Sequence, residues 1–165
     1  RGRARQTCAS PCPDPGAALR PMRASDLAAV ISLENRIYPF PWTLGNFRDS
    51  LDAGYECSVL CVDARIIAYA VTMATPDDIH LLNISVSVEQ QGRGLGKWLL
   101  TELMGLAAAR GFPSMLLEVR VSNVGAQRLY RSMGFAPIGL RRRYYPAVAN
   151  AREDAIVMRR VFDAQ

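Results

Sequence analysis

The chain has 165 residues, of which 50% are apolar and 21% are charged, and its formal net charge is +5. This length and apolar content are sufficient for one domain with a sizeable core, and they exclude a wholly disordered protein. The apolar runs fall short of the ~20 residues that a membrane span needs and no signal peptide is recognisable, so we expect a cytoplasmic protein without membrane association.

Residues 1–16 are rich in proline, alanine and arginine and show no hydrophobic periodicity. Five arginines and a single acidic residue fall within the first 23 positions, so most of the net charge belongs to this end of the chain. We interpret residues 1–16 as a disordered basic tail and residues 17–165 as a single domain. The alternative for the tail is weak binding to RNA or another polyanion.

Two helices are predicted near the start of the domain, after a strand that includes Leu19. Ser25 is the expected N-cap of the first helix, and two prolines in segment 38–42 separate it from a second helix at 43–51. The remaining predicted elements are, in chain order, strands at 55–62, 65–75 and 79–88, a helix at 94–110, a strand at 114–121, a helix at 123–133, and strands at 135–143 and 153–162. This order predicts a mixed α/β domain with one central sheet of about seven strands and four helices.

A glycine-rich turn joins the third of these strands to the following helix. Free N–H groups and the helix dipole at such a turn favour binding of phosphates, and glycines let the ligand approach the backbone closely. The turn does not fit a Walker loop, because Lys97 is followed by Trp98, and it lacks the third glycine of a dinucleotide-binding fingerprint. What remains is the pattern Gln-x-x-Gly-x-Gly at Gln91, Gly94 and Gly96.

Glu118 lies in the apolar run 114–120, which predicts a central strand buried on both faces. A buried carboxylate is unfavourable unless it is paired or hydrated. Strand alternation places Arg120 on the same face, so one reading is a structural ion pair, and the other is a general base in a cleft. On the next helix, Asn123 and Tyr130 can be explained without a ligand: Asn123 as the N-cap of the helix and Tyr130 as a residue of the hydrophobic core.

The four cysteines form no metal-binding pattern with the single histidine. Cys8 and Cys12 lie in the tail, whereas Cys57 and Cys61 stand four residues apart in an apolar run, where a strand places both on one face. His80 is distant from both pairs in sequence. We therefore expect free thiols, no metal site and no covalent catalysis by cysteine.

Together these features resemble the GCN5-related N-acetyltransferase (GNAT) superfamily over roughly residues 17–162. The resemblance implies a fold in which two central strands splay apart, and it implies acetyl-CoA as the second substrate. Its pyrophosphate would bind the glycine-rich turn and its pantetheine arm would follow residues 84–86. The contacts implied for acetyl-CoA are Ile84, Ser85, Val86, Gln91, Gly92, Arg93, Gly94, Leu95, Gly96, Lys97, Asn123 and Tyr130.

A more specific resemblance is to the bacterial RimI family of ribosomal-protein N-terminal alanine acetyltransferases. It rests on Asn-x₅-Leu-Tyr-x₃-Gly-Phe from Asn123, which follows Leu-Glu-Val-Arg, and on the segments 38–42, 141–146 and 152–155. The resemblance implies Glu118 as general base, Tyr130 as general acid, and Asn123 as a hydrogen-bond partner of acetyl-CoA or of a water. The residues implied for binding the peptide substrate are Tyr38, Pro39, Phe40, Trp42, Tyr144 and Tyr145.

The implied reaction is direct transfer in a ternary complex, with the N-terminus of a small-subunit ribosomal protein as acceptor. An α-amine with a pKa of about 7.7–8.0 is partly neutral at pH 7, whereas a lysine at about 10.4 is almost fully charged. Alternatives are a lysine or small-molecule amine as acceptor, and a non-catalytic acyl-CoA sensor or ribosome-binding module. The basic run 141–143 is either a solvated strand end or attracts an acidic or RNA-rich target. We expect a monomer without sequence-specific nucleic-acid binding.

Overall fold

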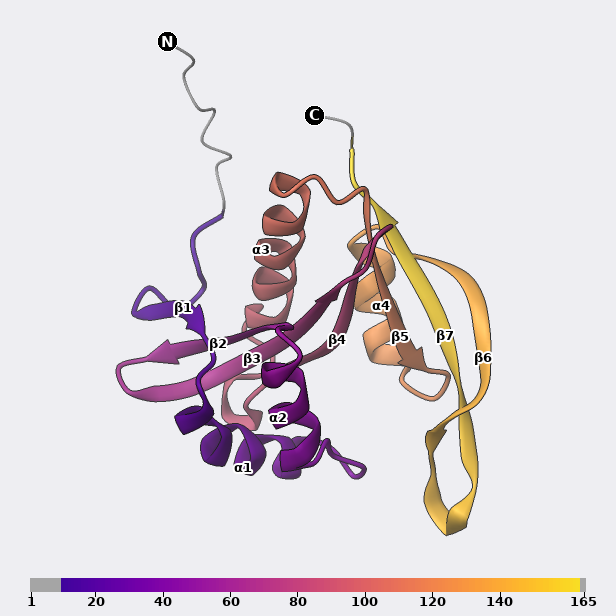
Figure 1. Cartoon of the computed structure of the whole chain (residues 1–165), viewed down its shortest axis with the longest axis horizontal. Coiled ribbons are helices and arrows are strands. Elements are labelled where there is room, and N and C mark those ends of the chain that lie inside the picture. The colour runs from indigo at the N-terminus through magenta and orange to yellow at the C-terminus, as the bar shows by residue number, and fades with distance from the viewer. Residues whose placement is uncertain (1–9, 164–165) are drawn as a thin grey trace.

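The structure is a computed structural model that describes residues 10–163. Within this range, seven strands form one sheet in the order β1-β2-β3-β4-β5-β7-β6, with four α-helices (Figure 1). The strands are β1 (Ala17–Pro21), β2 (Glu56–Val62), β3 (Arg65–Ala74), β4 (Ile79–Val86), β5 (Ser114–Arg120), β6 (Ala136–Pro146) and β7 (Arg152–Val161). The helices are α1 (Leu27–Ile37), α2 (Leu44–Asp52), α3 (Leu95–Ala109) and α4 (Val124–Ser132). The predicted mixed α/β fold is confirmed.

The centre of the sheet is its only parallel pairing within the described residues, between β4 and β5. Only three residue pairs join the two strands, and Leu81 opposite Leu117 is the last of them. Both strands then continue without pairing to each other, so the sheet opens between its two halves (Figure 1). This confirms the expected splay and leaves backbone N–H and C=O groups of β4 available on that side.

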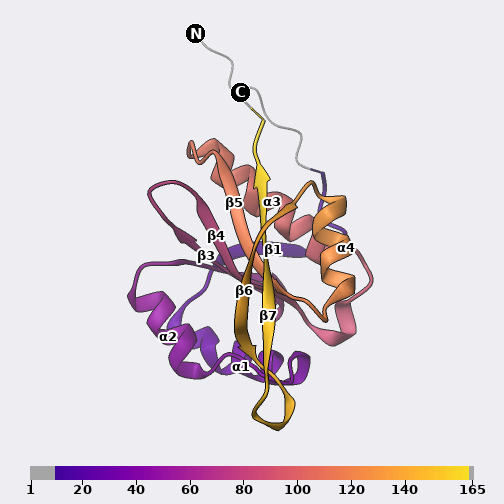
Figure 2. The same ribbon diagram turned by 90° about the vertical axis from the view of Figure 1, so that its right-hand side faces the viewer.

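Two separate cores stabilise the two faces of the sheet. Leu95 and Leu99 of α3 pack on one face together with α4, whereas Leu27 and Val30 of α1 pack with Phe47 of α2 on the other. Figure 2 shows the same division, with α3 and α4 on one side of the strands and α1 and α2 on the other. The sheet is therefore covered on both sides, which explains the apolar strands noted in the sequence.

Two local expectations were wrong. Ser25 lies within the short 3₁₀ helix Ala24–Asp26 and does not cap α1. That turn is held by Asp26, whose carboxylate accepts the Arg23 N–H at 2.7 Å and two hydrogen bonds from the Arg20 guanidinium at 2.7 and 2.8 Å. Asn123, by contrast, is confirmed as an N-cap, because its Oδ1 accepts the Ala126 N–H at 3.1 Å.

The second wrong expectation concerns α3, where the helical spacing of Leu95, Leu99, Leu103 and Leu106 predicts that these leucines form its apolar face. Leu103 is buried, but Leu106 is exposed, and Ala107 takes its place against the sheet. Cys57 and Cys61 are both buried, free and on one face of β2, as expected.

The segment 10–16 follows a defined course in the structure, although its composition led us to expect disorder. Its Cys12 is a free thiol that packs against the core beside α3. The Ser10 carbonyl oxygen accepts a hydrogen bond from Trp98 Nε1 at 2.9 Å, and the Asp14 side chain accepts the Gly16 N–H at 3.1 Å. Residues 1–9, including Cys8, lie outside the described residues.

Candidate active site

A cleft of about 710 Å³ opens where β4 and β5 separate. Its walls come from the end of α1 and the segment after it, from the facing edges of β4 and β5, from α4, and from the end of β6. The predicted site residues that line it are Tyr38, Pro39, Phe40, Trp42, Ile84, Glu118, Asn123, Tyr130 and Tyr145. Those that lie outside its lining are Ser85, Val86, Tyr144 and the turn residues Gln91, Gly92, Arg93, Gly94, Leu95, Gly96 and Lys97.

Glu118 is the first residue of β5 beyond the last pair with β4, so its carboxylate lies where the strands part. Its side chain is only 6% exposed, and its Oε2 lies 2.5 Å from His80 Nε2. Its Oε1 lies 3.2 Å from Arg141 Nε on β6. The carboxylate is therefore buried but paired with His80 through a hydrogen bond and with Arg141 through an ion pair, which offsets the cost of its burial.

The alternative ion pair between Glu118 and Arg120 does not form. Arg120 instead hydrogen-bonds Glu153 Oε1 at 3.2 Å and the Pro146 carbonyl oxygen at 2.8 Å. Its guanidinium also lies 4.4 Å from the centre of the Tyr145 ring. Arg120 therefore fastens the ends of β6 and β7 to the cleft and leaves Glu118 without a partner on its own strand.

Sequence reasoning missed the contact of His80 with Glu118, because it compared this histidine only with the cysteines. In the parallel pairing His80 is opposite Leu116, so its ring reaches Glu118 two residues further along β5. The register of β4 against β5 would have predicted this contact, but that register is set only when the sheet is assembled.

Sequence reasoning also missed Glu34, which is 1% exposed and accepts hydrogen bonds from three parts of the chain. Its carboxylate accepts the Trp42 N–H at 3.0 Å, the hydroxyl of Tyr69, and the Asn83 side-chain amide at 3.3 Å. The sequence did hold a signal, since Glu34 continues the apolar spacing of Leu27 and Val30 on α1. This carboxylate fixes the segment 38–42 against β3 and β4.

Tyr38 is anchored directly to the edge of β4. Its hydroxyl lies 2.7 Å from Ser85 Oγ and donates to the Ile84 carbonyl oxygen at 3.2 Å. Burial raises the pKa of Tyr38 above its usual value, with a smaller contribution from the charge of Glu34, so its hydroxyl keeps its proton at neutral pH.

Tyr130 projects from α4 into the cleft and packs edge-on against Phe135, with 5.8 Å between ring centres. Burial, with a smaller effect of Tyr38, raises the pKa of Tyr130 to about 12. Its hydroxyl is therefore protonated at neutral pH and is available as a hydrogen-bond donor.

The run 141–143 is solvent-exposed, as one of its two readings predicted, but it lies within β6 and not at its end, where the strand is irregular. The pairing of β6 with β7 shifts between Arg141 and Tyr145, and Arg143 has a positive φ of 52°. The bulge directs Arg141 toward Glu118 and Tyr145 into the cleft. Tyr144 remains exposed and packs edge-on against Tyr145 with 4.9 Å between ring centres.

The glycine-rich turn lies at the C-terminal end of β4, beyond the cleft lining. Gly92 and Gly94 have positive φ values of 77° and 82°, which a residue with a side chain adopts at a cost. The first hydrogen bond of α3 runs from the Trp98 N–H to the Gly94 carbonyl oxygen at 3.0 Å, so the N–H groups of 95–97 precede the helical ladder. Gln91 Nε2 ties the turn to the Val86 carbonyl oxygen at 3.0 Å.

The comparisons with known proteins decide the family. Residues 27–135 match the sequence model of the acetyltransferase (GNAT) family. The [ribosomal protein bS18]-alanine N-acetyltransferase of Salmonella typhimurium is 39% identical over 137 residues, which are 83% of this chain and 92% of the relative. The chain belongs to the GNAT acetyltransferase family.

Two further relatives agree with this membership. The bS18-alanine N-acetyltransferase of Escherichia coli K12 is 37% identical over 83% of this chain and 92% of its own length. The crystal structure of the E. coli ribosomal-protein-S18-alanine N-acetyltransferase superposes with a TM-score of 0.82 at 34% identity, covering 90% of this chain and 96% of that one.

Members of the GNAT family use acetyl-CoA, and the residues present suit it. Beyond Leu81, no β5 residue pairs with the edge of β4, which suits an extended amide-containing arm, although the Ile84 and Val86 carbonyl oxygens already accept hydrogen bonds from Tyr38 and Gln91. The glycine-rich turn at the end of this edge presents N–H groups at a helix N-terminus, which suits phosphates. Within the described residues, no group of three His, Cys, Asp or Glu side chains could hold a metal ion, and no helix could cross a membrane.

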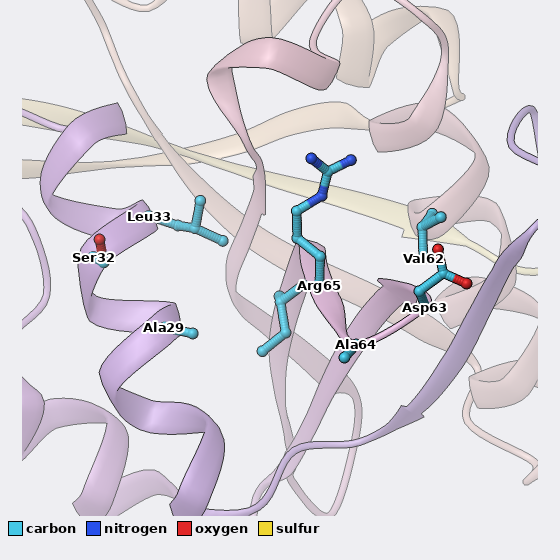
Figure 3. A pocket seen from close by; sticks show the side chains of 8 residues that line it. Ala29, Ser32, Leu33, Val62, Asp63, Ala64 and Arg65 are labelled. Atoms are coloured by element: carbon cyan, nitrogen blue, oxygen red, sulfur yellow. The ribbon is translucent and has the colours of Figure 1, made fainter.

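A second hollow, of about 760 Å³, lies between α1 and the turn of the β2–β3 hairpin. Figure 3 shows Ala29 and Leu33 of α1 on one side and Asp63 and Arg65 of the hairpin on the other. None of the predicted site residues lines it, and it contains no histidine or tyrosine.

Burial raises the pKa of the Cys57 thiol to about 11, so this cysteine is not a nucleophile at neutral pH. The cleft between β4 and β5 is therefore the candidate active site.

Proposed function

We propose that this protein transfers the acetyl group of acetyl-CoA to the α-amine of an N-terminal alanine, by direct transfer in a ternary complex. The observation that carries the proposal is the carboxylate of Glu118, 6% exposed, at the point where a peptide-sized cleft meets the open edge of β4. The relatives named as bS18-alanine N-acetyltransferases support the same acceptor, the N-terminus of a small-subunit ribosomal protein.

The shape of the cleft supports a peptide acceptor. The segment 38–42 forms one rim and Tyr145 the other, and the Arg120 guanidinium lies 5.4 Å from the Phe40 ring and 4.4 Å from the Tyr145 ring. Aromatic side chains held in place from two directions suit the first residues of an extended chain better than a small free amine. A small N-terminal residue such as alanine would fit between them.

Acetyl-CoA supplies the thioester whose acetyl group is transferred. Glu118 accepts a proton from the incoming α-amine, which needs little assistance because its pKa is only about 7.7–8.0. The pKa of Tyr130 is raised to about 12, well above the pKa of about 8.5 that is typical of a thiol. Tyr130 therefore keeps its own proton and stabilises the departing sulfur through a hydrogen bond. Segment 38–42 and Tyr145 orient the peptide.

The test is an acetyl-CoA turnover assay with a peptide that begins with free alanine and contains an internal lysine. We expect acetylation of this peptide and none of an otherwise identical peptide with a blocked N-terminus. The matched control is the same pair of peptides without the lysine. Equal activity on the free and blocked lysine peptides would make a lysine the acceptor and contradict the proposal.

A further inference from the structure

The single histidine of the chain lies against the carboxylate that we propose as the base. His80 Nε2 is 2.5 Å from Glu118 Oε2, and the two side chains are 14% and 6% exposed. Glu118 lines the cleft, whereas His80 is not among the lining residues. The imidazole therefore contacts the carboxylate from the protein side and not from the substrate side.

The chemistry of the pair fixes which atom donates. An ionised carboxylate only accepts hydrogen bonds, so His80 Nε2 carries the hydrogen and donates it to Oε2. The other oxygen, Oε1, lies 3.2 Å from Arg141 Nε, and the Arg141 side chain is 54% exposed to solvent. The two oxygens of Glu118 are thus distinct: Oε2 contacts the mostly buried His80, and Oε1 contacts the exposed Arg141.

The backbone explains why the carboxylate needs this support. Glu118 is the first residue of β5 beyond its pairing with β4, so it lacks a strand neighbour on that side. His80 lies within the paired part of β4, between Ile79 and Leu81, which are both buried in the core. His80, on the paired part of the sheet, therefore holds the side chain of Glu118, which lies where the two strands begin to separate.

We propose that His80 is a positioning residue for acetyl transfer: its Nε2–H holds Oε2 of Glu118, so that Oε1 is the atom that takes the proton of the α-amine. This inference rests on the proposed function. As the amine nitrogen bonds to the acetyl carbon, the carbon–sulfur bond breaks with its electron pair on sulfur, and the N–H proton passes to Oε1. His80 neither gains nor loses a proton in this step.

The kinetic test compares His80→Phe, which keeps a ring but loses the donor, with His80→Gln, which keeps an N–H donor but cannot act as a base. With the free-alanine peptide, we expect kcat of His80→Phe to fall by up to about a hundredfold while both KM values stay within about twofold. His80→Gln should recover most of the rate. If His80→Phe keeps the parental kcat, or if His80→Gln is as slow as His80→Phe, the positioning role is wrong.

Arg159→Gln is the matched control for a general effect on the sheet. It removes the 3.4 Å contact between Arg159 and Asp78, two residues before His80 at the start of β4, and should leave kcat unchanged. Thermal unfolding of each variant shows whether the domain remains folded. A fall in kcat of Arg159→Gln equal to that of His80→Phe would attribute the loss to the sheet and overturn the proposal.

Nitrogen NMR of the imidazole tests the pair without turnover, and its signals are unambiguous because the chain has one histidine. We expect the ring to carry a hydrogen on Nε2 in the parent protein, and we expect the Nε2 signal to shift in Glu118→Ala, where the hydrogen bond to the carboxylate is lost. A ring with its hydrogen on Nδ1 in the parent would overturn the proposal. If the parent acetylates no N-terminal peptide but shows the Nε2–H form, the proposed function fails while the pairing with Glu118 stands.

Discussion

The sequence allowed two roles for Glu118, and the structure excludes one partner, because the ion pair with Arg120 does not form. In the sequence it was either half of a structural ion pair or a base. In the structure Arg120 is occupied by Glu153 and Pro146, and Glu118 lines the cleft with His80 behind it. Its position at the end of the β4–β5 pairing is what places this residue in the lining of the cleft.

Replacement of Glu118 by glutamine removes the proposed proton acceptor while keeping the shape of the side chain. We expect kcat to fall by about 10²- to 10⁴-fold, the usual contribution of a general base. The remaining rate should increase with pH up to about 8, because the amine must then lose its proton to solvent. Steady-state kinetics across pH 6–9 checks this. An unchanged pH profile and rate would remove Glu118 from the mechanism.

Tyr130→Phe removes only a hydroxyl. Loss of one hydrogen bond to the departing sulfur should lower kcat about tenfold, while KM for acetyl-CoA changes by no more than about twofold. Because the pKa of Tyr130 is raised to about 12, its hydroxyl stays protonated and the parent kcat should show no loss from this group below about pH 10. A large rise in KM instead would identify Tyr130 as a ligand of acetyl-CoA.

At the scale of elements, the glycine-rich turn depends on backbone conformation and not on side chains. Gly94 has φ 82° and ψ 8° as the N-cap of α3, a left-handed conformation that costs another residue about 1–2 kcal/mol. The N–H groups ahead of Trp98 are oriented by this conformation. A substitution at Gly94 should therefore weaken phosphate binding more than it lowers the rate of the chemical step.

We expect Gly94→Ala to raise KM for acetyl-CoA several-fold while changing kcat little. The control is Gly105→Ala in the exposed middle of α3, where a new Cβ would meet no atom within 4 Å. That change should leave KM unchanged and stabilise the domain by about 0.5–1 kcal/mol. Equal KM values for the two variants would show that the turn does not bind the phosphates.

At the scale of the whole molecule, the site exists because the sheet divides into two halves. One half, β1 to β4 with α1, supplies the segment 38–42, and the other, β5 to β7, supplies Glu118 and Tyr145. The Arg120 guanidinium lies between Phe40 and Tyr145 and so connects the two sides of the cleft. The width of the cleft is thus set by contacts between distant parts of the chain.

Arg120→Gln should loosen this connection. We expect KM for the alanine peptide to rise several-fold, with KM for acetyl-CoA unchanged, because the glycine-rich turn lies outside this contact. The matched control is Arg128→Gln on the exposed side of α4, which should alter neither constant. Kinetics with each substrate varied in turn separates the two effects. A rise confined to KM for acetyl-CoA would contradict this assignment.

The sequence by itself determined the elements, their order and the type of chemistry. Hydrophobic periodicity, prolines and glycines act within a few residues, so the hairpin at residues 63–64, the Asn123 cap and the turn at Gly94 could be predicted from local physics. The tertiary structure alone decided which side chains meet. The contacts of His80 with Glu118 and of Glu34 with Trp42 join residues far apart in the chain. They depend on strand register and on where pairing stops, and no local pattern specifies either.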